Sequence, residues 1–372
     1  MSIPFIDLQA QRKVLGEKVS LAIQAVLDRG DFIQGQAVRT FETELAEFTG
    51  AAHVVSCANG TDALTLVGMA ENLGQGDAVF VPSFTFVATA EAFSLLGVTP
   101  VFVDVQPDTY NMDPASLKQA IIDAKQSGLS PRMVVAVDLF GQPADYDQIT
   151  IIAKENDLIV LADGAQSLGG EVKAKKVGTL ADYTTTSFFP AKPLGCYGDG
   201  GAIFCENGEK AALLTSLAQH GKGTEKYDNV RIGLNSRLDS LQAAILSVKL
   251  SVFAEELDKR QVVADRYTNA LHNLVTTPFV KDGYRSAWAQ YTLRLENRDA
   301  LKAHLAERGI PTAVYYPMPL NKQTGYQNDP VVSTGVAASE LAAQEVLSLP
   351  MHPYLESDVQ DQIITAVQDF YG

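Results

Sequence analysis

Residues 187–202 read Ser187-Phe188-Phe189-Pro190-Ala191-Lys192-Pro193-Leu194-Gly195-Cys196-Tyr197-Gly198-Asp199-Gly200-Gly201-Ala202. Proline restricts φ and lacks an N–H donor, while glycine permits close approaches, so the stretch suits neither a helix nor a strand interior. We expect its backbone to hold Lys192 in one place. A lysine in a partly desolvated pocket can lose its proton near neutral pH and attack a carbonyl, which is Schiff-base chemistry. The alternative is a solvated surface charge.

Composition and charge are those of a globular protein. The chain has 372 residues, of which 46% are hydrophobic and 20% charged, and this length suggests two domains or one large one. Its 44 acidic residues outnumber 29 basic ones, for a formal net charge of −15. That balance argues against nucleic acid or an anionic membrane as the main partner. An anionic substrate would need cations supplied locally.

The three cysteines, Cys57, Cys196 and Cys205, are unevenly spaced and form no CxxC pair. Reduced thiols of a cytosolic protein are the expected state. The N-terminus has no basic segment followed by a long apolar one, so no signal peptide is predicted. No apolar run approaches the roughly 18 residues of a membrane span. We expect a cytoplasmic protein.

Short apolar segments alternate with segments of helical period in the first half of the chain. The predicted strands cover residues 53–56, 78–81, 100–103, 133–137, 158–162, 183–187 and 202–205. The helices between them are predicted at 62–72, 88–96, 114–125 and 146–155. This alternation predicts an α/β fold whose mostly parallel, seven-stranded sheet is covered on both faces. Since ligands of such sheets bind at the carboxyl ends of strands, polar residues there are the candidates.

Helical patterns also precede and follow this region. They cover residues 9–29, with Gly30 as terminator, and 38–48, 210–219, 238–272, 299–308, 337–348 and 358–370, with one further strand at 289–294. A helix as long as 238–272 often bridges two domains. We therefore expect a large domain at 1–250 and a smaller C-terminal α/β domain at 251–372.

A phosphate site is one interpretation of the segment after the first predicted strand. Gly60 and Thr61 open the helix that follows. Free N–H groups, a hydroxyl and the positive end of the helix dipole suit a phosphate there. The alternative is an ordinary helix N-cap.

Asp163 ends the apolar run of another predicted strand. A charged group there needs a partner, because desolvating an ion costs several kcal/mol. It could form a buried salt bridge, or it could face the protonated ring nitrogen of pyridoxal phosphate. Gln166, three residues later, could reach the same cofactor, and Phe86 follows a further strand, where it could cover a flat ligand or belong to the core.

Four segments together resemble the DegT/DnrJ/StrS family of sugar aminotransferases. They are Asn59-Gly60-Thr61-Asp62-Ala63-Leu64, Phe84-Thr85-Phe86-Val87-Ala88-Thr89, Asp163-Gly164-Ala165-Gln166-Ser167 and Ser187-Phe188-Phe189-Pro190-Ala191-Lys192. The resemblance covers nearly the whole chain. It implies the aspartate-aminotransferase fold (type I pyridoxal-phosphate enzymes), with pyridoxal 5'-phosphate as cofactor.

The resemblance also implies roles for individual residues. Lys192 would form the Schiff base, Asp163 would pair with the pyridine nitrogen, Gln166 would lie near the phenolic oxygen and Phe86 over the ring. The phosphate would be bound by Gly60, Thr61, Ser187 and, from the neighbouring subunit, Asn235. A homodimer with shared active sites is expected on the same ground.

Within the family, residues 190–202 and 311–323 are similar to the subgroup that aminates C3 of UDP-2-acetamido-2-deoxy-3-oxo-glucuronic acid, with glutamate as donor, for surface polysaccharide. Arg237 is the candidate for the sugar carboxylate, because its guanidinium binds carboxylates bidentately; a surface salt bridge is the alternative. Tyr315 and Tyr316 are further substrate candidates, and members of the subgroup often carry histidine where Tyr315 stands.

Two other functions remain open at this point. The chain could be an aminotransferase for a dTDP- or UDP-linked 3-keto or 4-keto 6-deoxy sugar. It could also be a regulatory protein that binds pyridoxal phosphate without turnover. Lys192 argues against the dehydratases of the family, which lack this lysine.

Overall fold

A computed structural model describes residues 3–225 and 227–372. The helices are α1 (Leu8–Leu15), α2 (Glu17–Arg29), α3 (Gln36–Thr49), α4 (Gly60–Ala70), α5 (Ala88–Ser94), α6 (Pro114–Gln126), α7 (Tyr146–Glu155), α8 (Gly208–Leu217), α9 (Ser240–Leu271), α10 (Arg298–Glu307), α11 (Ala337–Glu345) and α12 (Ser357–Tyr371). The strands are β1 (His53–Cys57), β2 (Asp77–Pro82), β3 (Thr99–Val103), β4 (Ser130–Val137), β5 (Ile159–Asp163), β6 (Glu171–Val172), β7 (Lys175–Lys176), β8 (Tyr183–Ser187), β9 (Gly201–Cys205), β10 (Tyr284–Arg285), β11 (Tyr291–Arg294) and β12 (Val346–Leu349). Short 3₁₀ turns lie at Leu139–Gly141 and Leu320–Lys322.

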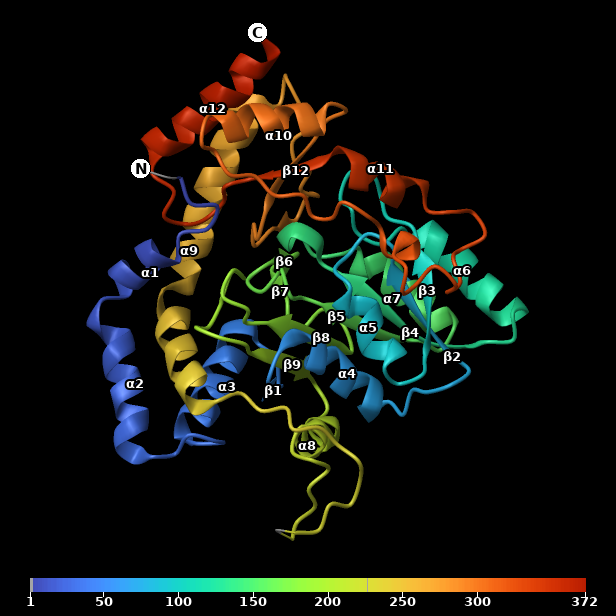
Figure 1. The fold of residues 1–372 in the computed structure, drawn as a ribbon. Helices are drawn as coiled ribbons and strands as arrows, with labels where there is room; N and C mark the ends of the chain where they lie inside the picture. The colour runs from blue at the N-terminus through green and yellow to red at the C-terminus, as the bar shows by residue number, and fades with distance from the viewer. Residues whose placement is uncertain (1–2, 226) are drawn as a thin grey trace.

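The seven predicted strands form one sheet in the order β1-β9-β8-β5-β4-β2-β3. The strands from β8 to β3 are parallel, and β9 runs antiparallel to both of its neighbours. The α/β fold with a mostly parallel sheet is therefore confirmed (Figure 1).

Both faces of the sheet are buried, which explains why its strands are continuously apolar. In β2, Val79 and Val81 pack with α4 and α5 on one face, while Phe80 packs with α6 and α7 on the other. Successive side chains of a strand point to opposite faces, so each face receives its own hydrophobic layer.

The long helix α9 belongs to two cores. Its first half packs through Leu246, Leu250 and Phe253 against α3 and against residues 187–202, the stretch that contains Lys192. Its second half packs through Val263 and Tyr267 with α10, α12 and the antiparallel pair β11–β12. Figure 1 shows α9 running from beside α2 and α3 up to the C-terminal helices. The domain boundary at residue 250 stays a prediction.

Two predicted elements are wrong in part. The helix expected over 9–29 is broken at Gly16, whose φ of 57° and ψ of −132° separate α1 from α2, although Gly30 ends α2 as predicted. The helix expected over 337–348 ends at Glu345, because residues 346–349 pair with β11 as strand β12. No helix among the described residues has the length and hydrophobicity to cross a membrane.

Candidate active site

Asp163 lies at the carboxyl end of β5, in the middle of the sheet, and is buried. Its Oδ2 accepts a hydrogen bond from the Thr89 hydroxyl (2.9 Å) and its Oδ1 one from the Ala165 N–H (3.2 Å). Burial raises the pKa of Asp163, against the opposing effect of these two donors and of the Lys192 charge. The carboxylate is thus short of positive partners, as expected of a group that receives a cation from a ligand.

The Lys192 side chain lies within electrostatic reach of Asp163. Burial lowers the pKa of its amine, and the charge of Asp163 acts in the opposite direction. Among residues 3–225 and 227–372 its amine has no hydrogen-bond or ion-pair partner, whereas its backbone N–H donates to the Phe189 carbonyl (2.9 Å). A fixed backbone below an unpaired amine suits a nucleophilic lysine.

Gly60 and Ser187 meet where α4 begins and β8 ends. A Cβ atom on Gly60 would lie 2.9 Å from the Ser187 Cβ, a distance that real Cβ atoms do not tolerate. The Asn59 side chain caps α4 by accepting from the Asp62 N–H (2.8 Å). The early N–H groups of α4 and the Ser187 hydroxyl therefore face one small space, which has the character of a phosphate cradle. Thr61 follows in the first turn of α4.

Gln166 is buried and held from two sides. Its Oε1 accepts from the Phe140 N–H (2.7 Å), and its Nε2 donates to the Tyr316 hydroxyl (3.3 Å). Phe140 has a φ of 60°, in the left-handed region, so its N–H is aimed by an unusual turn. No local sequence pattern predicts this contact.

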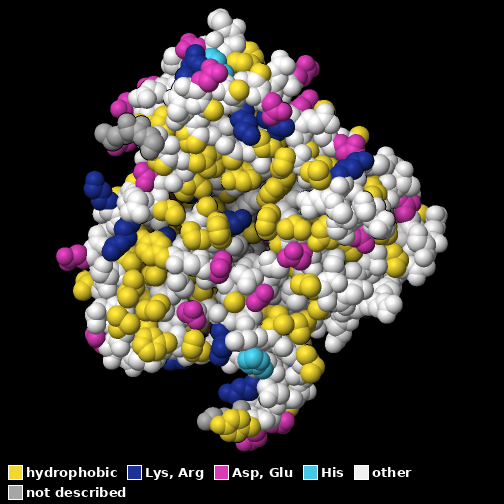
Figure 2. All heavy atoms as spheres, viewed as in Figure 1, with side chains coloured by type: hydrophobic (Ala, Val, Ile, Leu, Met, Phe, Trp, Pro, Cys, Tyr) yellow, Lys and Arg dark blue, Asp and Glu magenta, His cyan; other side chains and the backbone are white. Residues whose placement is uncertain are grey.

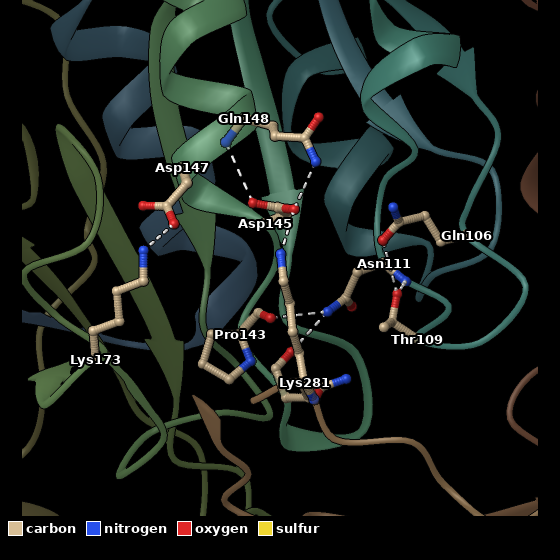
Figure 3. Close-up of polar contacts among 10 residues, drawn as sticks. Gln106, Thr109, Asn111, Pro143, Asp145, Asp147, Gln148, Lys173 and Lys281 are labelled. Carbon is tan, nitrogen blue, oxygen red and sulfur yellow. Dashed lines mark hydrogen bonds and ion pairs between the residues drawn. The ribbon is translucent and has the colours of Figure 1, made fainter. Parts of the chain in front are cut away.

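Side-chain bonds fix the loop that contains Phe140. Asn111 donates to the carbonyls of Gln142 and Pro143 (2.9 and 3.2 Å), and its Oδ1 accepts from the Leu139 N–H (2.9 Å). Lys281, from the segment before β10, forms an ion pair with Asp145 (2.7 Å). Figure 3 shows Asn111 directed at this loop and Lys281 at Asp145.

Aromatic side chains form the outer wall of the site. Phe86 is 54% exposed, and its ring centroid lies 6.1 Å from that of Tyr316, which in turn contacts Tyr315 (5.8 Å). Burial raises the pKa of Tyr316, with a smaller contribution from Asp163. Figure 2 shows a hollow near the middle of the viewed face of the molecule, with hydrophobic side chains around it. Phe86 is therefore free to contact a ligand rather than buried in the core.

Among the described residues, Asn235 and Arg237 form no side-chain hydrogen bond or ion pair with this cluster, although Ser236 between them accepts from the Ala58 N–H (3.1 Å), next to the start of α4. They follow a loop that projects away from the sheet beyond α8 (Figure 1). Asn235 is exposed, and in the described part of the chain Arg237 has no ion pair. The loop also exposes Val230 and Ile232, at 53% and 87%.

The structure thus joins Lys192, Asp163, Gln166, Phe86 and Tyr316, and beside them Gly60 and Ser187. Sequence reasoning missed Thr89, although it stands at the end of the quoted segment 84–89. The three cysteines are free and buried.

The donor set fits pyridoxal phosphate. The cradle at Gly60 and Ser187 suits a phosphate, the buried carboxylate of Asp163 suits a pyridinium N–H, and the unpaired amine of Lys192 suits an aldehyde. Comparison with known proteins decides the family, since residues 14–368 match the DegT/DnrJ/EryC1/StrS aminotransferase family.

The chain belongs to this family. It is 46% identical to UDP-2-acetamido-2-deoxy-3-oxo-D-glucuronate aminotransferase from Pseudomonas aeruginosa, over 95% of this chain and 96% of that protein. A DegT/DnrJ/EryC1/StrS aminotransferase from Brucella abortus has the same fold, with a TM-score of 0.98 at 48% identity and full coverage of both chains. NtdA from Bacillus subtilis, with bound cofactor PMP, gives a TM-score of 0.88 at 28% identity, over 99% of this chain and 85% of that one.

As a DegT/DnrJ/EryC1/StrS aminotransferase, the protein is an enzyme that uses pyridoxal phosphate. The expected cofactor and the aspartate-aminotransferase type of fold are both confirmed.

Proposed function

We propose that the enzyme moves an amino group from glutamate to C3 of UDP-2-acetamido-2-deoxy-3-oxo-glucuronic acid, in the biosynthesis of surface polysaccharide. The observation that carries the proposal is the similarity to the Pseudomonas aeruginosa enzyme named for this substrate, over 95% of this chain. The cytoplasmic location stays a prediction.

In this proposal Lys192 binds the cofactor and carries the proton. Pyridoxal phosphate, when bound, supplies an electron sink for the carbanion formed at the substrate carbon. In each half-reaction the Lys192 amine would move a proton between the substrate carbon and the cofactor carbon, first as general base and then as general acid. Burial lowers the pKa of this amine and so increases its unprotonated fraction at neutral pH.

Asp163 is assigned to the pyridine nitrogen, where a carboxylate keeps the ring N–H protonated. The Thr89 hydroxyl and the Ala165 N–H hold both of its oxygens, so the carboxylate is oriented before a cofactor arrives. Gln166 is assigned to the phenolic oxygen, Phe86 to the ring face, and Gly60, Thr61 and Ser187 to the phosphate.

The substrate residues are proposed to come from two subunits. Arg237 would bind the sugar carboxylate and Asn235 the phosphate of the neighbouring site, since Asn235 is exposed and the loop before it exposes the apolar side chains of Val230 and Ile232. Tyr315 and Tyr316 would contact the sugar, as the Tyr316 hydroxyl accepts a hydrogen bond from Gln166 and Tyr315 packs against Tyr316.

The glutamate half-reaction tests the cofactor assignment. Wild-type enzyme loaded with pyridoxal phosphate should release one 2-oxoglutarate per site when glutamate is added, with loss of the visible cofactor band. Lys192→Ala should lack that band and release none. A variant that keeps the band would refute the assignment of Lys192.

Mixed dimers test the shared site. Lys192→Ala and Arg237→Ala subunits, each inactive alone, should regain about a quarter of wild-type turnover after mixing, because about half of the dimers then hold one intact site. Mixtures that stay inactive although subunits exchange would place both residues in one chain.

A further inference from the structure

Two side chains of α9 bind the backbone of the loop that carries Lys192. The Lys249 amine donates to the Gly195 carbonyl at 2.6 Å, and it lies 4.3 Å from the centroid of the Tyr197 ring. Gln242 binds the main chain of Tyr197 twice, accepting from its N–H (2.9 Å) and donating to its carbonyl (3.3 Å). The two α9 residues are seven positions apart and therefore lie on one face of the helix.

The loop is built to accept these contacts. A Cβ on Gly198 would lie 3.0 Å from the Gln242 Nε2, so glycine lets the amide approach the main chain. A Cβ on Gly195 would lie 2.6 Å from the carbonyl oxygens of Phe189 and Pro190, so the turn folds tightly on itself just after Lys192. The Cys196 N–H closes the turn by donating to the Phe188 carbonyl (2.8 Å).

Stability alone does not explain a lysine at position 249. Its side chain is 1% exposed and, within the described chain, no carboxylate lies at ion-pair distance. Burying an ammonium group costs several kcal/mol, and an apolar side chain of similar volume is often neutral or stabilising at such a place. What the ammonium adds is a directed, charge-assisted hydrogen bond to one carbonyl, three residues from Lys192.

The same helix carries the C-terminal core. Tyr267 and Leu271, at the far end of α9, are fully buried there. Seven residues beyond Lys249, Glu256 accepts from Gln11 of α1 (2.9 Å) and from Tyr354. Beyond the loop contacts, α9 is thus also held near its middle and at its C-terminal end.

We propose that Lys249 and Gln242 are positioning residues: they hold residues 195–197 against α9 and thereby set the place of the Lys192 amine. The inference rests on the proposed role of Lys192. It adds two side chains of α9 to the residues that shape the site. Within the described residues, both side chains form their hydrogen bonds with residues 195 and 197 and not with the residues assigned to the cofactor.

Hydrogen exchange of the apoenzyme tests the proposal without cofactor or substrate. In Lys249→Met and Gln242→Leu the amides of Cys196 and Tyr197 should exchange roughly tenfold faster, the loss of one hydrogen bond that holds the loop. Amides of β4 should keep their rates. Lys259→Met is the matched control, since Lys259 is a half-buried lysine of the same helix that pairs with Glu255.

Kinetics of the loaded enzyme give the second readout. Both variants should lower the maximal single-turnover rate of the glutamate half-reaction about tenfold, with the half-saturating glutamate concentration changed less than threefold, because misplacing the amine affects the chemical step more than binding. Unchanged exchange at residues 195–197 would overturn the proposal, as would faster exchange over the whole chain, which marks a merely structural role. If Lys249→Met does not fold, Gln242→Leu decides. Wild type that fails to deaminate glutamate would refute the proposed function and leave the exchange result intact.

Discussion

The Thr89 hydroxyl donates a hydrogen bond of 2.9 Å to the Oδ2 of Asp163, from a residue 74 positions earlier in the chain. Because Thr89 has one proton and gives it to the carboxylate, its 3.1 Å contact with the Thr85 hydroxyl must have Thr85 as the donor. Both threonines are buried, at 1% and 2% exposure. A two-hydroxyl chain therefore orients the carboxylate assigned to the cofactor nitrogen.

Thr89→Val should weaken cofactor binding. Valine keeps the shape and removes the donor, so the pKa of Asp163 rises further and less carboxylate is available to the pyridinium. The loss of a hydrogen bond to a charged group predicts a Kd for pyridoxal phosphate about tenfold higher or more. Fluorescence titration of the apoenzyme measures it. Thr89→Ser, which retains the hydroxyl, should bind like wild type; equal affinities of all three proteins would exclude this role for Thr89.

Gly60→Ala should also reduce cofactor affinity, for a steric reason. The added methyl would lie 2.9 Å from the Ser187 Cβ and displace one wall of the phosphate cradle, and such overpacking costs about 1–3 kcal/mol. Gly74→Ala is the control, since its Cβ would meet nothing within 4 Å. The prediction is checked by the Kd for pyridoxal phosphate and for inorganic phosphate in both variants, and is contradicted if Gly60→Ala binds both as tightly as Gly74→Ala.

Asp138 predicts a pH dependence of stability. Its carboxylate is fully buried and accepts from the Ser167 and Tyr146 hydroxyls, each at 2.6 Å, and from the Ala144 N–H at 2.8 Å. Burial raises its pKa to about 7 in spite of these donors. The folded state therefore holds the Asp138 proton more tightly than the unfolded chain, so this stabilisation is complete below about pH 4 and disappears as the pH rises through 7.

Asp138→Asn removes the ionisable carboxyl group, so the variant should lack this contribution to the pH dependence of stability. Between pH 5 and 7.5 the free energy of unfolding of wild type should fall relative to that of the variant by about 2–3 kcal/mol. Denaturant titrations at one protein concentration measure the difference. A difference that is constant over this range would show that Asp138 does not titrate there.

The sheet and the strand-end residues could be predicted because their signals are local. Continuous apolar strands and intervening helical periods placed Asp163 and Lys192 at strand ends, and parallel topology brings such ends together. The contact of Gly60 with Ser187 follows from the same topology, since β1 and β8 flank β9.

The contacts that could not be predicted depend on how distant segments of the chain pack together rather than on local sequence pattern. No periodicity signals that Thr89 meets Asp163, that the Phe140 N–H meets Gln166, or that Lys249 reaches Gly195. The break at Gly16 was missed because the apolar spacing continues across it, and residues 346–349 were assigned to a helix because so short an apolar run fits either structure until β11 pairs with it.

The most direct test of the central claim is a turnover assay with two keto sugars. Purified enzyme with pyridoxal phosphate and glutamate would be offered UDP-2-acetamido-2-deoxy-3-oxo-glucuronic acid, generated in place by a dehydrogenase, and separately a UDP-4-keto-6-deoxy sugar. We predict that only the 3-keto acid yields an amino sugar, with one 2-oxoglutarate per product. Amination of the 4-keto sugar alone would contradict the assignment of a 3-keto uronate to this aminotransferase.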